Sequence, residues 1–309
     1  MALRDHPHAS LLGLPQELID MIVFKTVEDG DKSDLFDISR TCSALRTASL
    51  PLIYERFRCS PNNFDEEELL ELFTKSPFAT DVGKHAKILE MQFLDPWDDT
   101  LYRLLECTKN LKSLYLHYCL KYDDDGKGCC VDTRRLSKAL RHVGHSLVEM
   151  RIHYRFGNRL NETKEWPESD LKHHAMDLRQ LVALRALTIP TSILLGWRPE
   201  EAPMLGSILP PNLTTLTFIR DHSFNYARFL ANLKSFETLL LDFSRNQRLA
   251  QWTPRLESIC VQNGYWLETK KDWEGRTDVI RRILEENGLK YIESRVGLID
   301  WSTHTMYEQ

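Results

Sequence analysis

The chain has 309 residues, with 40 Lys and Arg against 45 Asp and Glu, and its formal net charge is −5. This near balance argues against nonspecific nucleic-acid binding, which needs a concentrated basic field. No apolar run reaches the roughly 18 residues that a membrane-spanning helix needs, and the polar stretch 1–10 lacks the apolar segment of a signal peptide. The cysteines number seven, and without an export signal we expect reduced thiols in the cytosol or nucleus.

Residues 14–58 predict a series of short helices. Pro15 suits a first helical turn, and Gly30 suits the turn that ends this helix. Ser33 or Asp34 can cap a second helix, and we expect a third from Ser49. The apolar residues that recur at helical spacing are, in order, Leu14, Leu18, Met21 and Ile22; Leu35, Ile38, Cys42 and Leu45; and Leu50, Ile53, Tyr54 and Phe57.

So small a helical unit buries too little apolar surface to be comfortably stable alone. It can bury its remaining face against a partner protein. Alternatively, these segments are simply the first helices of a larger helical core.

The residue string itself resembles an F-box of the fungal type. The stretch 14–22, Leu-Pro-Gln-Glu-Leu-Ile-Asp-Met-Ile, looks like the start of that motif, and 34–46 is similar to its second conserved block. The stretch 50–57 resembles the ending with Pro, Leu and Tyr that is common in fungal members. These blocks stand in the family's order, and only the connection 26–33 departs from it, being more acidic than the usual short turn.

The resemblance implies that residues 10–60 dock on a Skp-type adaptor, which bridges to a cullin and a RING subunit. By position in the motif, the implied adaptor-binding residues are Leu14, Pro15, Leu18, Ile22 and Leu35. A second set is implied to hold the helices together: Ile38, Cys42 and Leu45.

Beyond residue 60, a short pattern returns in which apolar residues are separated first by two positions and then by one. Its copies are Ile88, Met91 and Phe93; Leu111, Leu114 and Leu116; Leu147, Met150 and Ile152; Leu184, Leu187 and Ile189; Leu213, Leu216 and Phe218; Phe236, Leu239 and Leu241; Leu256, Ile259 and Val261; and a degraded copy at Leu289 and Ile292. This is the strand signature of a leucine-rich repeat, with the period-two alternation of a pleated strand.

Amphipathic helix candidates lie between the copies, at 65–76, 99–108, 134–143, 171–182, 226–233 and 277–287. Residues 61–309 are therefore predicted to form an irregular leucine-rich-repeat-like α/β solenoid, with parallel strands, outer helices and a client-binding surface. An ordinary α/β domain with a parallel sheet remains the alternative, because strand–helix alternation alone would give that too. Loops are expected at 121–131, 155–169 and 196–211.

No motif for catalysis or for a cofactor is recognisable. His142 and His145 could share a helix face, but no cysteine pair at a suitable spacing completes a zinc site. The aspartates of the loop 123–128 are consecutive, unlike the alternate ligands of a calcium loop. We therefore assign no catalytic, cofactor-binding or metal-binding residue.

The sequence thus favours a substrate-recognition subunit of an SCF-type ubiquitin ligase, a receptor and not an enzyme. Its expected partners are a Skp-type adaptor, through it a cullin–RING ligase, and a client protein of unknown identity; no nucleic acid, membrane or cofactor is expected. One alternative is a non-ligase scaffold that retains an F-box. Another is an enzyme whose site is assembled from distant segments.

Overall fold

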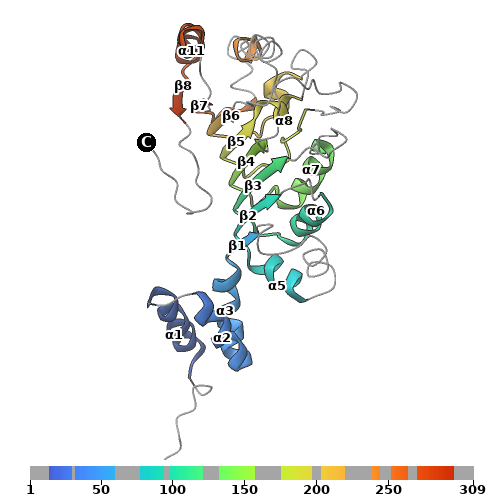
Figure 1. Ribbon diagram of the computed structural model, residues 1–309, viewed down its shortest axis with the longest axis vertical. Coiled ribbons are helices and arrows are strands. Elements are labelled where there is room, and N and C mark those ends of the chain that lie inside the picture. Colours follow the sequence, from blue (N-terminus) through green and yellow to red (C-terminus); the bar gives the residue numbers. More distant parts are fainter. Residues whose placement is uncertain are drawn as a thin grey trace, which may run out of the picture.

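A computed structural model describes residues 14–29, 32–59, 77–93, 98–120, 132–156, 175–196, 203–219, 238–243, 252–263 and 270–295. Its N-terminal helices form a small bundle at one end of the molecule, and the rest of the described chain is built on a parallel sheet (Figure 1).

The bundle consists of α1 (Gln16–Asp29), α2 (Lys32–Thr41) and α3 (Ser43–Tyr54). The third helix begins six residues before the predicted start at Ser49, because Cys42 has an extended backbone (φ −158°, ψ 165°) that separates it from α2. Pro51 lies inside α3 instead of at its start. The predicted second stripe is therefore divided, with Leu35 and Ile38 on α2 and Leu45 on α3.

The sheet has eight strands, all parallel, in the order β1 to β8, so every strand lies beside its neighbours in the sequence. The strands are β1 (Arg56–Cys59), β2 (Ile88–Phe93), β3 (Ser113–Leu120), β4 (Glu149–Phe156), β5 (Ala186–Pro190), β6 (Thr215–Ile219), β7 (Ser258–Asn263) and β8 (Lys290–Arg295). An α/β fold with a parallel sheet is therefore confirmed. Phe57, which we expected on the third helix, lies instead in the edge strand β1.

Helices stand between many of these strands, as parallel connections require. They are α5 (Pro77–His85), α6 (Asp98–Cys107), α7 (Thr133–Leu140), α8 (Thr191–Leu195) and α11 (Lys270–Glu286), with 3-10 turns η2 (Arg141–Val143) and η5 (Leu205–Ser207). The predictions at 99–108 and 134–143 are confirmed by α6 and by α7 with η2, whereas α5 and α8 were not predicted. Helix α11 begins seven residues before the predicted Thr277 and ends before Gly288, whose φ of 77° suits a glycine.

All but one of the predicted strand copies lie at a strand. The exception is Phe236, Leu239 and Leu241, because residues 238–243 are helical and β6 pairs directly with β7. The buried residues there are Leu240 and Phe243, which are three positions apart and so share a helix face. Phe236 itself lies outside the described residues.

The predicted helix 171–182 is also wrong over its described part, 175–182, which has no helix. The backbone N–H groups of Met176 and Leu178 donate instead to the carbonyls of Leu194 and Ile208. These N–H groups are therefore bonded to α8 and to the residue that follows η5, and not within a helix of their own. The predicted helices 65–76 and 226–233, and the predicted loop 121–131, lie outside the described residues.

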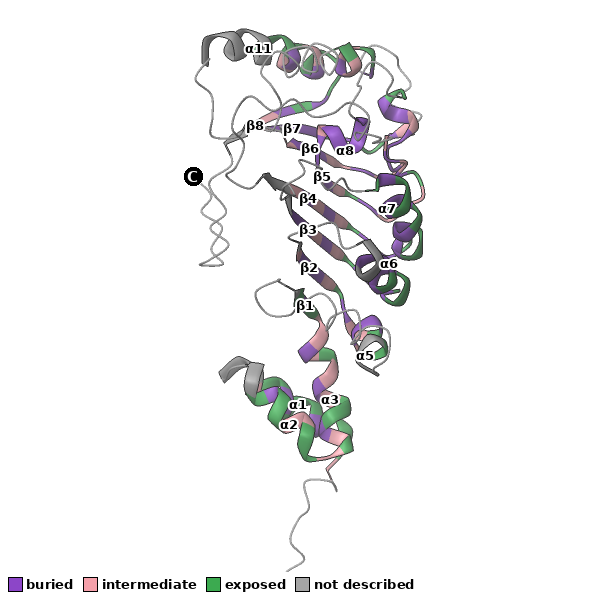
Figure 2. Ribbon diagram, turned by 45° about the vertical axis from the view of Figure 1, so that its right-hand side comes forward, coloured by how far each residue is buried: buried purple, intermediate pink, exposed green. Residues whose placement is uncertain are grey.

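One hydrophobic core runs through the sheet from Phe57 to Tyr291. The residues at its centre are aligned by strand register and are almost completely buried: Leu89, Leu114, Met150, Leu187, Leu216 and Ile259. Helices such as α6 and α7 pack on this face of the sheet (Figures 1 and 2). The alternate strand residues therefore point to the opposite face.

Candidate interaction surfaces

The helical bundle has a small core of its own, separate from that of the sheet. Its buried residues come from all three helices: Ile19, Val23, Leu35, Leu45 and Ile53. Ile38 and Cys42 pack against this group, as the resemblance implied for residues that hold the helices together. The bundle is thus a packed unit, and α3 joins it directly to β1.

Large apolar side chains remain exposed on the outside of this bundle. Of nine exposed large hydrophobic residues in the described part of the chain, five lie on α1 and α2: Leu18, Met21, Ile22, Phe24 and Phe36. Leu18 and Ile22 are 39% and 41% exposed and stand one helical turn apart. Such clustering on a small unit is typical of a surface that a partner covers.

The residues predicted to bind an adaptor are not all at the surface. Pro15, Leu18 and Ile22 are exposed and Leu14 is half-buried. Leu35 has no exposed surface, because it fills the centre of the bundle core. We therefore assign Leu35 to the packing of the bundle and keep the other four as candidate contacts.

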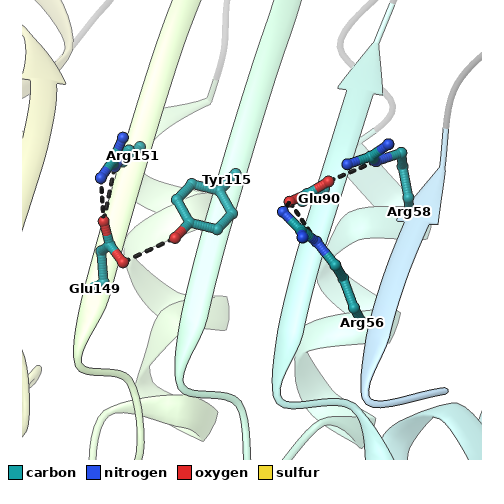
Figure 3. Close-up of polar contacts among 6 residues, drawn as sticks. All are labelled: Arg56, Arg58, Glu90, Tyr115, Glu149 and Arg151. Carbon is teal, nitrogen blue, oxygen red and sulfur yellow. Dashed lines mark hydrogen bonds and ion pairs between the residues drawn. The ribbon is translucent and has the colours of Figure 1, made fainter. Parts of the chain in front are cut away.

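A second surface is the face of the sheet opposite the helices. At its β1–β2 end lies Glu90, whose side chain is only 10% exposed between two arginines of the edge strand (Figure 3). The Nε–H groups of Arg56 and Arg58 donate to its two oxygens at 2.9 and 2.6 Å, and a terminal N–H of Arg56 also donates. Burial raises the pKa of Glu90, but the hydrogen bonds and charges of the two arginines outweigh it and hold the pKa below its ordinary value.

The next strands carry a second polar group on the same face. The hydroxyl of Tyr115 donates to Glu149 at 2.8 Å, and the same carboxylate accepts from Arg151 at 2.7 Å (Figure 3). The Arg151 guanidinium also lies 5.5 Å from the centre of the Tyr115 ring. Burial, with the adjacent Glu149 carboxylate, raises the pKa of Tyr115. Strand register places Tyr115 beside Glu90, so the two polar groups adjoin.

A pair of histidines follows two positions further along these strands. His117 and His153 are register partners on β3 and β4. Burial, the neighbouring His117 and the charge of Arg151 together lower the pKa of His153 to about 4. His153 is therefore neutral at physiological pH.

Beyond β4 the same face changes in character. The positions aligned with Tyr115 and Arg151 are Thr188, Thr217 and Cys260. The charged part of the described face is therefore concentrated on β1 to β4, except for Lys290 on β8.

Of the other candidate groups from the sequence, the loop 123–128 lies outside the described residues. His142 and His145 are exposed, one in η2 and one in the turn after it, and the described residues contain no group of three or more potential metal ligands. Among the described helices, none is both long and apolar enough to cross a bilayer.

The charged residues on this face of the sheet were not predicted from the sequence, although part of the pattern that places them there is visible in it. Tyr115 and Arg151 each stand between the last two apolar residues of a predicted copy, so aligning these copies places them side by side. The same alignment places Gln92 and not Glu90 beside Tyr115, because the predicted copy at Ile88, Met91 and Phe93 is two positions out of the observed register, in which Leu89 pairs with Leu114. Arg56 and Arg58 carry no such signal, because the pattern of residues 14–58 predicts helices and no strand there.

Comparison with known proteins gave no match: no family model, no curated protein and no solved structure is significantly similar to this chain.

Proposed function

We propose that this protein is the substrate-recognition subunit of an SCF-type ubiquitin ligase, with an F-box at residues 10–60 and a leucine-rich-repeat-like solenoid at residues 61–309. The F-box part of the proposal rests on the resemblance of residues 14–57 to the family's motif blocks. The solenoid part is supported by the sequential order of the parallel strands, since each repeat of such an architecture contacts only its neighbours.

The single observation that carries the proposal is the exposed apolar surface of α1 and α2, which includes Leu18 and Ile22. Fully burying a side chain of this size contributes about 1.5–3 kcal/mol. A Skp-type adaptor that covers these residues would bury the surface that so small a bundle leaves exposed. Pro15 and Leu14 would extend the contact at the start of α1.

The chemistry of such a subunit is proximity alone. A client held on the sheet and an adaptor held on the bundle are joined by the α3–β1 connection. Tethering raises the effective concentration of the client near the ubiquitin-charged enzyme, so the protein needs no active site of its own.

The test is binding of the full chain to a purified Skp-type adaptor, measured by calorimetry. The double variant Leu18→Ala/Ile22→Ala should weaken binding at least tenfold, while Val279→Ala, an equally exposed apolar residue on α11, should bind like wild type. If the wild-type chain does not bind the adaptor, or if the double variant binds as well as wild type, the F-box proposal is wrong.

The alternative, a scaffold that binds the adaptor without supporting a ligase, predicts the same binding result. The two are separated by client turnover in cells. A ligase subunit requires at least one protein whose half-life lengthens both on cullin inhibition and with Leu18→Ala/Ile22→Ala. If no half-life changes, scaffolding is favoured.

A further inference from the structure

Arg56, Arg58 and Glu90 form a fixed group on the face of the sheet opposite the helices. Glu90 is nearly buried and accepts hydrogen bonds from both arginines. The arginine side chains are 50% and 40% exposed, and both point toward Glu90 (Figure 3). The group therefore combines two partly exposed positive side chains with one nearly buried carboxylate.

Glu90 also orients these arginines. Its carboxylate accepts hydrogen bonds from the Nε–H of each arginine and from one terminal N–H of Arg56. The other terminal N–H groups of the two arginines are not bonded to Glu90. A guanidinium has a planar fork of donors that matches a carboxylate or a phosphate. Holding the side chains in place before a ligand arrives lowers the entropic cost of binding it.

The charge of the group selects between those two anions. The arginines contribute two positive charges and Glu90, with its depressed pKa, one negative charge, so the group carries a single net positive charge. A carboxylate neutralises this charge. A phosphate ester carries about −1.5 to −2 at neutral pH, so it would leave excess negative charge close to Glu90.

An aromatic surface lies next to this group. Tyr115 is the register partner of Glu90 on the neighbouring strand, and its hydroxyl is held by Glu149. Neighbouring strands are about 4.8 Å apart and an extended chain rises about 3.3 Å per residue. A peptide that crosses the strands would therefore place an acidic residue at the arginines and an apolar residue, roughly two or three positions away, at Tyr115.

We propose that Arg56 and Arg58, oriented by Glu90, bind the Asp or Glu carboxylate of an acidic client segment, with Tyr115 contacting a neighbouring apolar residue. The description of this segment as a client rests on the proposed function. Binding of an acidic peptide by the arginines does not.

The experiment is selection of peptides from a random dodecamer library on the immobilised full-length protein. Wild type should enrich Asp or Glu at one position, with an apolar residue two or three positions away. The enrichment should persist with Arg103→Gln, an exposed arginine on α6 that serves as the matched control, and be lost with Arg58→Gln. Circular dichroism and thermal melting establish that each variant is folded.

Arg58→Lys is a second test in case Arg58→Gln does not fold. Lysine keeps the positive charge beside Glu90 but lacks the planar fork of donors of a guanidinium. It should weaken binding of the selected peptide at least fivefold, as measured by fluorescence anisotropy. Replacing the peptide's acidic residue with its amide should abolish binding, and replacing it with phosphoserine should not strengthen it.

Absence of acidic enrichment on wild type, or its persistence with folded Arg58→Gln, would overturn the proposal. A phosphoserine peptide that binds tenfold tighter than the Glu peptide, through Arg58, would overturn the choice of a carboxylate. Adaptor binding is measured on the same variants. If the chain selects acidic peptides but does not bind the adaptor, the F-box proposal fails and the proposal of an acidic-peptide site stands.

Discussion

Glu90 is the residue on which the charged end of the sheet depends, and its role makes stability sensitive to acid. Its pKa is held below the ordinary value of 4.5. A carboxyl group with a depressed pKa stabilises the folded state above the unfolded pKa, and this stabilisation is lost as pH falls through the folded value.

Glu90→Gln should therefore lower the free energy of unfolding at pH 7 by about 1.5–3 kcal/mol, the usual contribution of hydrogen bonds to charged groups. The variant should also lose less stability than wild type between about pH 5 and pH 3. Urea unfolding across this range measures both effects. Parallel wild-type and variant curves would contradict the assignment.

His153 gives a second pH dependence in a different range. Its pKa falls from 6.5 to about 4 through burial, His117 and Arg151. Between these two values His153 is protonated in the unfolded chain but neutral in the folded chain. The free energy of unfolding should therefore fall as pH drops from 6.5 toward 4. The lowered pKa of His153 corresponds to a loss of roughly 3 kcal/mol in the free energy of unfolding at pH 4.

The variant His153→Gln should flatten this part of the profile. Urea titrations at intervals between pH 7 and pH 4 provide the measurement. If His153→Gln has the same slope as wild type, protonation of His153 does not control stability in this range.

At the scale of the elements, close backbone contacts fix how neighbouring helices pack. A Cβ atom on Gly83 of α5 would lie 2.7 Å from the carbonyl oxygen of Cys107 and 2.9 Å from its Cβ, at the end of α6. In an open helix position, replacing glycine with alanine stabilises by about 1 kcal/mol. Here the obstacle includes backbone, and overpacking of this kind costs about 1–3 kcal/mol.

Because the steric cost exceeds the gain in helix propensity, Gly83→Ala should lower the melting temperature. Thr80→Ala is the matched control, since Thr80 is exposed on the same helix and its replacement should be neutral or slightly stabilising. Thermal denaturation followed by circular dichroism measures both. A melting temperature for Gly83→Ala at or above that of wild type would show that α5 can move away from α6.

The sequence predicted these elements unevenly, for physical reasons. Strands such as β3 and β6 were found because alternating apolar residues face one continuous core. Residues 238–243 were misread, because a short apolar run fits either period and tertiary contacts select the helix. The exposed surface of α1 could be anticipated from its stripe, whereas the burial of Leu35 depends on how three helices meet.

At the scale of the whole molecule, the bundle and the sheet have separate hydrophobic cores that meet at the end of α3. The bundle core contains Ile19, Val23, Leu35, Leu45 and Ile53, and the sheet core extends over all eight strands. Tyr54, at the end of α3, packs against both. Regions with few buried apolar contacts open at lower free energy than a large core.

Native-state hydrogen exchange should therefore reveal two units, with the amides of α1 and α2 opening at a lower free energy than those of β3 and β4. Tyr54→Ala should widen this gap, because it removes a side chain shared by both cores, while Thr47→Ala, an exposed residue of the same helix, should leave it unchanged. An adaptor that covers Leu18 and Ile22 should raise the opening free energy of α1 selectively, since it binds only the closed bundle. If α1 and β3 instead exchange at the same free energy and respond equally to Tyr54→Ala, the molecule unfolds as one unit.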